Sequence, residues 1–360
     1  VGIVVGTHAL LEERVIFKDL GLLVIDEQHR FGVEQRDALR ERSSEPPHVL
    51  VMTATPIPRT VAMTIFGDLD VSTLRELPLG RSPITTHVVS ALNKPAHLER
   101  AWQRAREEVS NSHQVYVVAP RISAGDDSDM QRFGLTADEL SRARALMGED
   151  EAVTQKAPMH SVEELFPQLV SGPLKGLRVS KLHGRMEASE KEEVMKAFSS
   201  HETDILISTT VIEVGVDVPN ASMMIIMDAD RFGVSQLHQL RGRVGRGTTP
   251  GLCLLVTQCD ESSEAMERLK AVAATTDGFE LSRLDLEQRR EGDVLGSAQS
   301  GVKSHLRLLR VIRDEDVITH AREIAERLVA DDHELAHLPH LKAEVDKLRQ
   351  EERASYLEKR

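Results

Sequence analysis

Residues 22–29 of the 360-residue chain read Leu22-Leu23-Val24-Ile25-Asp26-Glu27-Gln28-His29. A short apolar run without polar alternation predicts a strand that is covered on both faces, as in a parallel sheet. The run ends directly in two carboxylates, and the carboxyl ends of parallel strands are where α/β sheets bind ligands. The stretch therefore predicts an α/β fold with a polar site at one sheet edge. Taken alone, Asp-Glu after a strand is also a common polar strand end.

Similar apolar runs recur along the chain and alternate with stretches of helical character. Residues 95–109 carry a proline where a first helical turn tolerates it, and residues 189–198 follow the same pattern. Because strands and helices alternate, we expect parallel sheets. The runs predicted as strands are Gly2–Val5, Leu20–Ile25, Val49–Met52, Val115–Val118, Leu177–Leu182, Ile205–Ile207, Met223–Met227 and Leu252–Val256.

The chain is long enough for two domains with separate cores. Prolines and glycines interrupt the pattern at residues 77–85, so we place a boundary there. The prediction is an incomplete first lobe at residues 1–80 and a second lobe at 81–258, with an acidic surface insertion at about 123–167. Further on, Glu264–Ala274 and Val317–Val329 have apolar residues at helical spacing, which predicts amphipathic helices that pack on the second sheet.

The composition is that of a globular protein, with 40% hydrophobic and 29% charged residues. No apolar run approaches the roughly 18 residues that span a bilayer, and no secretory leader opens the chain, so a cytoplasmic location is expected. Cys253 and Cys259 lack further ligands at metal spacing, so neither a disulfide nor a zinc site is expected. The net charge of -13 opposes nucleic-acid binding, but arginines concentrate at residues 231–246 and 283–310, which predicts a local basic track.

Three more polar segments follow predicted strands. The segment Thr53-Ala54-Thr55-Pro56 is expected at the same sheet edge as Asp26, and residues 209–217 follow the strand at 205–207. Residues 236–247 read Gln-Leu-His-Gln-Leu-Arg-Gly-Arg-Val-Gly-Arg-Gly, in which glycines leave the arginines room to reach phosphate oxygens. By itself this last segment also fits a solvated basic helix. Four such elements in this order favour a phosphate site.

The order of these elements resembles that of the superfamily-two helicases. The residue sequences of the motifs resemble the RecG family over most of the chain, from Gly6 to about Gly301. A transcription-repair coupling translocase is the nearest alternative. The resemblance implies two RecA-like lobes, a translocation hairpin and loop at residues 259–305, and a C-terminal helical region at 306–360. The segments that carry it are Gly6–Leu11, Asp26–Gln35, Met52–Thr60, Gly67–Asp70, His183–Met186 and Val211–Pro219.

The same resemblance implies ATP and Mg²⁺ as ligands and site residues for them. Asp26 would serve Mg²⁺ and Glu27 the attacking water, with Arg243 and Arg246 as further catalytic groups. For each hydroxyl and histidine, His183 included, the alternative is a loop cap or a satisfied polar group. The residues that would bind the nucleotide are Gly215, Asp217 and Gln239. The residues that would couple hydrolysis to movement are His29, Thr53, Thr55, Arg289, Arg290 and Gln299, together with Gln239. The residues that would contact the DNA are Gly6, Thr7, His8, His183, Gly184, Arg185, Thr209 and Thr210.

The implied function is an ATP-dependent helicase that translocates on double-stranded DNA, remodels stalled forks and branch-migrates Holliday junctions in recombination and repair. The implied partners are branched DNA and single-stranded DNA-binding protein, and the implied state is a monomer. The alternative is a non-catalytic fragment that binds DNA or a protein. The RecG-type sequence that follows the motor lobes disfavours an RNA helicase.

Two departures from the family pattern are visible. Residues 289–293 read Arg-Arg-Glu-Gly-Asp where the family has Arg-Gly-Pro-Gly-Glu, and the loss of the proline and one glycine predicts a different local turn at Arg289 and Arg290. The 360 residues also contain no Gly-x-x-x-x-Gly-Lys-Ser/Thr loop for the phosphates, and the first residue is Val1. We expect the sequence to be part of a longer protein and to hydrolyse ATP negligibly by itself.

Overall fold

The computed structural model describes residues 2–7, 10, 15, 17–26, 47–53, 72–74, 82–123, 160–213, 217–288 and 315–347. The chain divides into two compact units, Val1–Pro56 with Leu74–Asp285 and Ile57–Thr73 with Leu286–Arg360. The predicted α/β architecture with parallel sheets is confirmed.

The first sheet of the described residues has two parallel strands, β1 (Leu22–Ile25) and β2 (His48–Val51). Their register pairs Ile25 with Val51, and the backbone N–H of Met52 donates to the carbonyl of Ile25 at 2.8 Å. Both strands were predicted from their apolar runs. The parallel pairing puts the ends of β1 and β2 at one edge of the sheet.

The predicted strand at Gly2–Val5 is wrong for this structure. Residues 2–6 have no strand conformation, and Ile3 and Val5 are 83% and 91% exposed. An apolar run becomes a strand only where a neighbouring strand pairs with its backbone groups. Within the part of the chain that the structure describes, no strand pairs with these residues.

The second sheet has, among the described residues, six parallel strands in the order β3-β8-β7-β4-β6-β5. Strand β3 was not predicted, because the polar residues Thr85, Thr86 and His87 interrupt its apolar pattern. It is an edge strand, paired only with β8 in this sheet, so its outer side need not be apolar. The strands are β3 (Ile84–Ser90), β4 (Gln114–Val118), β5 (Val179–Leu182), β6 (Ile205–Ser208), β7 (Ala221–Ile226) and β8 (Gly251–Thr257).

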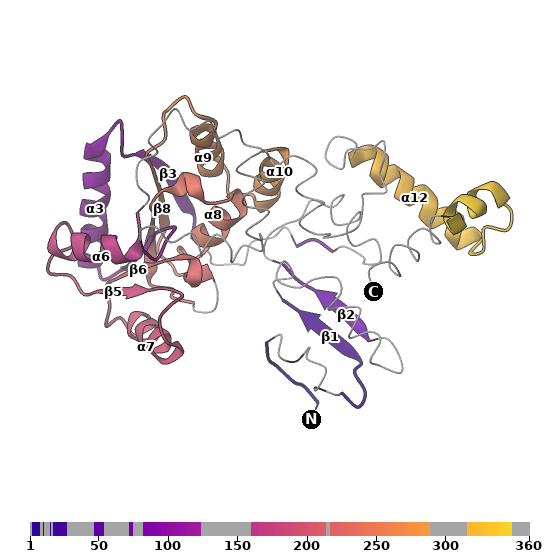
Figure 1. Ribbon diagram of the computed structural model, residues 1–360, viewed down its shortest axis with the longest axis horizontal. Helices are drawn as coiled ribbons and strands as arrows, with labels where there is room; N and C mark the ends of the chain where they lie inside the picture. The colour runs from indigo at the N-terminus through magenta and orange to yellow at the C-terminus, as the bar shows by residue number, and fades with distance from the viewer. Residues whose placement is uncertain are drawn as a thin grey trace. The chain divides into compact units, whose positions relative to one another are not determined.

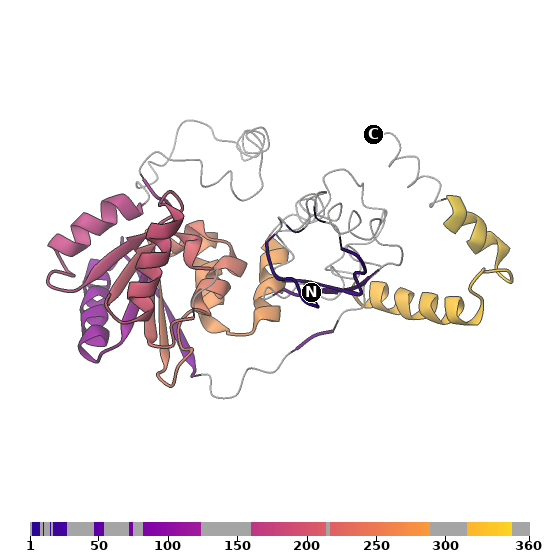
Figure 2. The same cartoon turned by 90° about the horizontal axis from the view of Figure 1, so that it is seen from below.

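Two hydrophobic cores lie on the two faces of this sheet. Strand β4 is buried throughout: Val115 and Val117 contribute to one core, while Tyr116 and Val118 contribute to the other. The first core also contains α3 (Pro95–Ser110) and α6 (Val162–Ser171). The opposite face is covered by α7 (Ala188–Ser199), α8 (Val234–Arg241), α9 (Glu264–Ala274) and α10 (Gly278–Gln288). Figures 1 and 2 show α3 on one side of the sheet and α9 and α10 on the other.

Local signals explain where several helices start. Pro95 occupies the first turn of α3, as predicted, because its missing N–H needs no partner there. Ser161 caps α6 by accepting from the N–H of Glu164, and Ser263 caps α9 by accepting from the N–H of Met266 at 3.2 Å. Since α6 begins at Val162, the predicted irregular stretch to about 167 ends earlier, by residue 161; residues 124–159 lie outside the described ranges.

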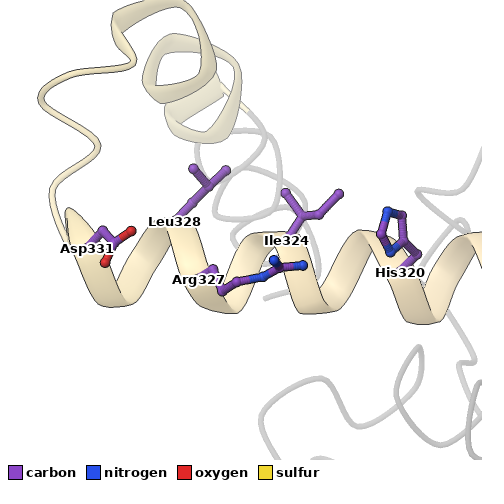
Figure 3. Close-up of a pocket in the computed structure, with 5 residues that line it drawn as sticks. All are labelled: His320, Ile324, Arg327, Leu328 and Asp331. Carbon is purple, nitrogen blue, oxygen red and sulfur yellow. The ribbon is translucent and has the colours of Figure 1, made fainter.

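Helix α12 (Glu315–Asp331) confirms the helix predicted at 317–329. Its packing on the second sheet stays a prediction, and Val317, Ile324 and Val329 are about half exposed. Figure 3 shows Ile324 and Leu328 on one side of α12, where they line a shallow hollow with His320, Arg327 and Asp331. Among the described residues, no helix combines the length and apolar character that a membrane crossing requires.

Candidate functional site

The first group of predicted site residues lies at the end of the two-stranded sheet. Asp26 directly follows β1, and Thr53 comes two residues after β2, so the register of the strands places both at one edge. Both residues are exposed, as are Gly6 and Thr7. The structure thus places Asp26 and Thr53 at a shared edge, and the rest of the predicted segment, residues 54–56, lies outside the described residues. Glu27, His29, Thr55 and His8 lie outside the described residues.

A second group lies at the carboxyl edge of the six-stranded sheet. His183, Gly184 and Arg185 follow β5, whereas Thr209 and Thr210 follow β6. These two strands are neighbours, with Leu182 paired to Ser208 and the N–H of Thr209 donating to the carbonyl of Leu182 at 3.2 Å. The structure therefore brings together two segments that lie about 25 residues apart in the sequence.

Within this group, His183 is not an open side chain. It is 7% exposed, and its Nε2 lies 3.0 Å from Oε1 of Glu163 on α6. Glu163 also accepts from Nζ of Lys181 at 2.9 Å, and this bond with Lys181 is the main cause that lowers the pKa of the Glu163 carboxyl. Arg185, in contrast, is exposed. The accessible cation of the group is thus Arg185 rather than His183.

The loop that carries Arg185 is held in place by a lysine. Nζ of Lys191, on α7, donates to the carbonyl of Gly184 at 2.7 Å, and NH1 of Arg185 donates to Oγ of Ser123 at 3.2 Å. A charge-assisted bond of this kind contributes about 1.5–3 kcal/mol when it is well shielded and less at a surface. The loop therefore presents a fixed backbone with positive charge around it.

A third group lies at the amino edge of the same sheet. Asp217 shortly precedes β7, and Arg246 precedes β8. NH1 of Arg246 lies 3.3 Å from Oδ1 of Asp217, and its Nε donates to the carbonyl of Gly242 at 3.0 Å. Two residues of the predicted nucleotide site, from different motifs, are therefore in direct contact. Gly215 lies outside the described residues, and Gln239 is half-buried on α8.

Residues 242–247, here called the arginine loop, need glycine at two positions. Gly245 has a φ of +67°, and a Cβ there would lie 2.9 Å from Cγ1 of Ile84. A Cβ on Gly247 would lie 2.5 Å from the carbonyl oxygen of Pro219, while Oγ of Ser82 donates to the Gly247 carbonyl at 3.1 Å. The loop thus packs closely against the chain that enters β3 and against the turn before β7.

The segment from Thr209 to Val218 connects the two edges. It leaves the carboxyl end of β6 and reaches the amino end of β7, and buried Ile212 and Val218 anchor it in the core. Strands β6 and β7 are the two neighbours of β4, and residues 214–216 of the segment lie outside the described residues. The segment is therefore the covalent link between the Thr209–Thr210 group and the Asp217–Arg246 pair.

Tyr116, in the middle of β4, was missed by the sequence analysis. Burial raises the pKa of its phenol to about 12, while the positive charges of Arg243 and Arg246 act in the opposite direction. Its ring packs against Phe198 with the centroids 4.9 Å apart. Tyr116 thus stays protonated and supports the sheet within electrostatic range of the arginine loop. An apolar strand with one tyrosine gave no signal for this position.

Two polar contacts were also missed. Arg241, at the end of α8, is 3% exposed and bonds to carbonyls at the end of α9. Asp228 follows β7 with a left-handed φ of 47° and accepts from the backbone N–H of His160 at 2.7 Å. Arg241 lies inside a quoted motif, so an arginine in a last helical turn was the available signal. The predicted coupling residues Arg289, Arg290 and Gln299 lie outside the described residues.

Comparison with known families defines the class of this chain. Residues 1–64 match the DEAD/DEAH box helicase model, and residues 153–248 match the helicase conserved C-terminal domain. The chain therefore carries the paired domains of a helicase motor. Residues 275–354 match "ATP-dependent DNA helicase RecG, domain 3, C-terminal".

Individual relatives narrow the class to one family. The chain is 54% identical to the ATP-dependent DNA helicase RecG of Mycobacterium bovis over 325 residues, which is 90% of this chain and 41% of that protein. It is 43% identical to the RecG of Synechocystis sp. over 343 residues, covering 95% of this chain and 37% of that one. The solved structure of RecG bound to a three-way DNA junction matches with a TM-score of 0.57 and 35% identity, over 86% of this chain and 35% of that one. The chain belongs to the RecG helicase family, and it spans about two fifths of the length of these curated relatives.

Proposed function

We propose that the protein containing this chain is an ATP-dependent DNA helicase that moves on double-stranded DNA, remodels stalled forks and branch-migrates Holliday junctions. One observation carries the proposal. The Asp217–Arg246 pair and the Thr209–Thr210 group lie at opposite edges of one sheet and are joined by a short stretch of chain in which Ile212 is buried. A change at the nucleotide edge can therefore move the nucleic-acid edge through a short covalent path.

Arg246 is proposed as a catalytic residue for phosphoryl transfer. Its side chain is about one-third exposed at the sheet edge, and contacts with Asp217 and the Gly242 carbonyl fix the direction of the guanidinium. Guanidinium groups stabilise the charge on transferring phosphoryl oxygens, an effect worth several orders of magnitude in rate. Asp217 holds this cation in place and, with Gly215 and Gln239, contributes to nucleotide binding. Arg243 is the second proposed cation.

Asp26 and Glu27 are proposed for Mg²⁺ and for the attacking water. The exposed carboxylate of Asp26 at the end of a parallel strand is an oxygen ligand of the kind that Mg²⁺ prefers, so this residue fits the ion. Bound Mg²⁺ neutralises phosphate charge. Glu27 would orient water, while His29, Thr53, Thr55, Arg289, Arg290 and Gln299 would couple hydrolysis to movement.

The carboxyl edge of the second sheet is proposed to bind the DNA backbone. Arg185 supplies an exposed charge and Thr210 a half-buried hydroxyl from the end of the neighbouring strand. Thr209, which is 6% exposed, shapes this edge together with His183 and Gly184. Gly6, Thr7 and His8 are proposed for the same role on the first lobe. Contacts of this kind position a protein on DNA without reading its sequence, which suits a motor for forks and Holliday junctions.

The proposed partners follow the same chemistry. The RecG of the solved relative is bound to a three-way DNA junction, which supports branched DNA as the substrate of this protein too. We also propose that it works as a monomer in the bacterial cytoplasm and meets single-stranded DNA-binding protein at forks. Size-exclusion chromatography with light scattering tests the monomer.

The test uses the whole protein and a synthetic fork with matched DNA and RNA arms. We expect ATP hydrolysis that DNA stimulates and fork regression that requires ATP, and both are lost in Glu27→Gln while fork binding remains. Binding without hydrolysis in the wild type would favour the non-catalytic alternative. Preferential unwinding of the RNA duplex would reject the DNA assignment.

A further inference from the structure

Arg241 is a buried arginine that joins two helices. It is the last residue of α8, and its NH1 donates to the carbonyls of Val272 at 2.9 Å and of Thr275 at 2.7 Å, at the carboxyl end of α9. Its NH2 lies 3.0 Å from Nδ1 of His238, one turn earlier on α8. Because a guanidinium only donates, Nδ1 of His238 is the acceptor in this contact.

These contacts give α9 a carboxyl-terminal cap from another helix. The last four carbonyls of a helix have no partner within it, and a cation is favoured there by the helix dipole. Helix α9 has no basic residue in its own last turn. Arg241 supplies both the missing donors and the missing charge, and at 3% exposure it does so away from solvent.

The cap formed by Arg241 lies between two other features of the chain, the arginine loop and the start of α10. On its own side, Arg241 is followed directly by the arginine loop, which ends at the Arg246–Asp217 pair. On the other side, Thr275 leads into Asp277, whose Oδ1 accepts from the N–H of Phe279 at 2.8 Å at the start of α10. Only two residues therefore separate the capped carbonyl of Thr275 from the first residue of α10, Gly278.

Helix α10 is anchored in the same hydrophobic core as α8 and α9. Leu281 is 1% exposed in the core that also holds Leu240 of α8 and Val272 of α9. A shift of the arginine loop therefore reaches α10 through Arg241 and through the shared core, because close-packed interiors transmit displacement. Beyond α10 the chain continues to residues 289–293.

We propose that Arg241 is a positioning residue that couples the arginine loop to the α9–α10 junction. The role rests on the proposed function: a nucleotide-dependent shift of Arg243 and Arg246 is passed through the Arg241 guanidinium to α10 and so to DNA movement. Arg241 itself touches no reacting atom. It decides how much movement each hydrolysed ATP produces.

The matched control is Arg268, on α9 itself. Its NH2 donates to the carbonyl of Asp230 at 2.6 Å, so Arg268→Gln also removes a guanidinium–carbonyl bond from α9 but leaves the arginine loop untouched. His238→Ala is a milder variant that loosens Arg241 without removing it. Both keep the test informative if Arg241→Gln folds poorly.

The experiment measures DNA-stimulated ATP hydrolysis and base pairs moved per ATP by the whole protein. For Arg241→Gln we expect hydrolysis within about threefold of wild type and movement per ATP reduced at least tenfold; His238→Ala should show a smaller loss, and Arg241→Lys a partial recovery. Arg268→Gln should keep the wild-type ratio. If hydrolysis and movement fall together in Arg241→Gln and His238→Ala, as they would for loss of folded protein, the coupling role is overturned. If the wild-type protein binds forks but hydrolyses no ATP, the proposed function is rejected, and the coupling role is rejected with it.

Discussion

NH1 of Arg246 lies 3.3 Å from Oδ1 of Asp217, although the two residues are 29 positions apart in the chain. The pair forms because the segment before β7 and the segment before β8 meet at one edge of the sheet, where these two strands are neighbours. The contact holds a cation at the sheet edge that we propose binds the nucleotide. The first prediction follows from that position.

Replacing Arg246 tests its catalytic role. For Arg246→Ala we expect kcat for ATP hydrolysis to fall on the order of a thousandfold with little change in KM, because the guanidinium acts mainly on transition-state charge. Arg246→Lys should not restore the rate, since an ammonium lacks the planar fork. Arg100→Ala, which breaks an exposed pair with Glu107 on α3, is the control and should leave kcat unchanged. An equally large loss there would argue for a general effect of arginine removal.

Gly245→Ala tests the packing of the arginine loop. A left-handed backbone costs a non-glycine residue about 1–2 kcal/mol, and the new Cβ would also approach Cγ1 of Ile84 to 2.9 Å. Gly176→Ala is the matched control, because Gly176 has a φ of +86° but nothing within 4 Å of its Cβ position. We expect the free energy of unfolding from denaturant titration to fall more in Gly245→Ala, by about 1 kcal/mol or more. Equal decreases in the free energy of unfolding of the two variants would show that the arginine loop accommodates the added Cβ without a packing penalty.

The His160–Asp228 pair predicts a pH-dependent stability. The hydrogen bond with Asp228 is the main cause that raises the pKa of His160 above its ordinary value of 6.5. A raised folded pKa means that the stabilisation is fully present below pH 6.5 and is lost as pH rises through the folded pKa. The free energy of unfolding of wild type should therefore exceed that of His160→Gln at pH 5.5, and the difference should shrink by pH 8.5.

Asp228→Asn separates this titration from the backbone contact. The amide can still accept from the N–H of His160, but it carries no charge to favour the imidazolium. In the Asp228→Asn background, His160→Gln should therefore change stability equally at both pH values. A pH dependence that persists there would assign the effect to another group.

Arg185→Ala tests the proposed DNA edge. Loss of one phosphate contact should weaken fork binding for all sequences and lower the slope of log affinity against log salt by about 0.9. Fluorescence anisotropy at several salt concentrations measures both. Arg178→Ala is the control, because Arg178 lies at the opposite end of β5 and bonds to Asp204 with its Nε at 3.2 Å. An unchanged salt slope in Arg185→Ala would remove this residue from the DNA contact.

The 360-residue polypeptide by itself should hydrolyse ATP at no more than the background rate. Its sequence contains no glycine-lysine phosphate loop, so backbone donors and a lysine for the β- and γ-phosphates are missing from this polypeptide. Phosphate release with and without DNA measures the rate. DNA-stimulated turnover that Glu27→Gln abolishes would contradict the expectation.

Much of the fold was predictable from local patterns. The buried strands β4, β6, β7 and β8 are covered on both faces and so have continuous apolar runs, and helices α3 and α9 carry proline or serine start signals. Edge strand β3 was missed because half-exposed strands lack this pattern. The run at Gly2–Val5 was misread because an apolar run does not say whether a partner strand pairs with it.

The sequence by itself determined the parallel α/β class, the order of the motifs and the family, since these depend on residue types and spacing along the chain. Tertiary structure alone decided which of these residues meet. It paired Arg246 with Asp217, buried His183 against Glu163, and placed Arg241 at the end of α9. The physical reason is that strand order in a sheet is set by how crossovers pack, and this packing brings distant segments to a common edge without leaving a local signal in either one.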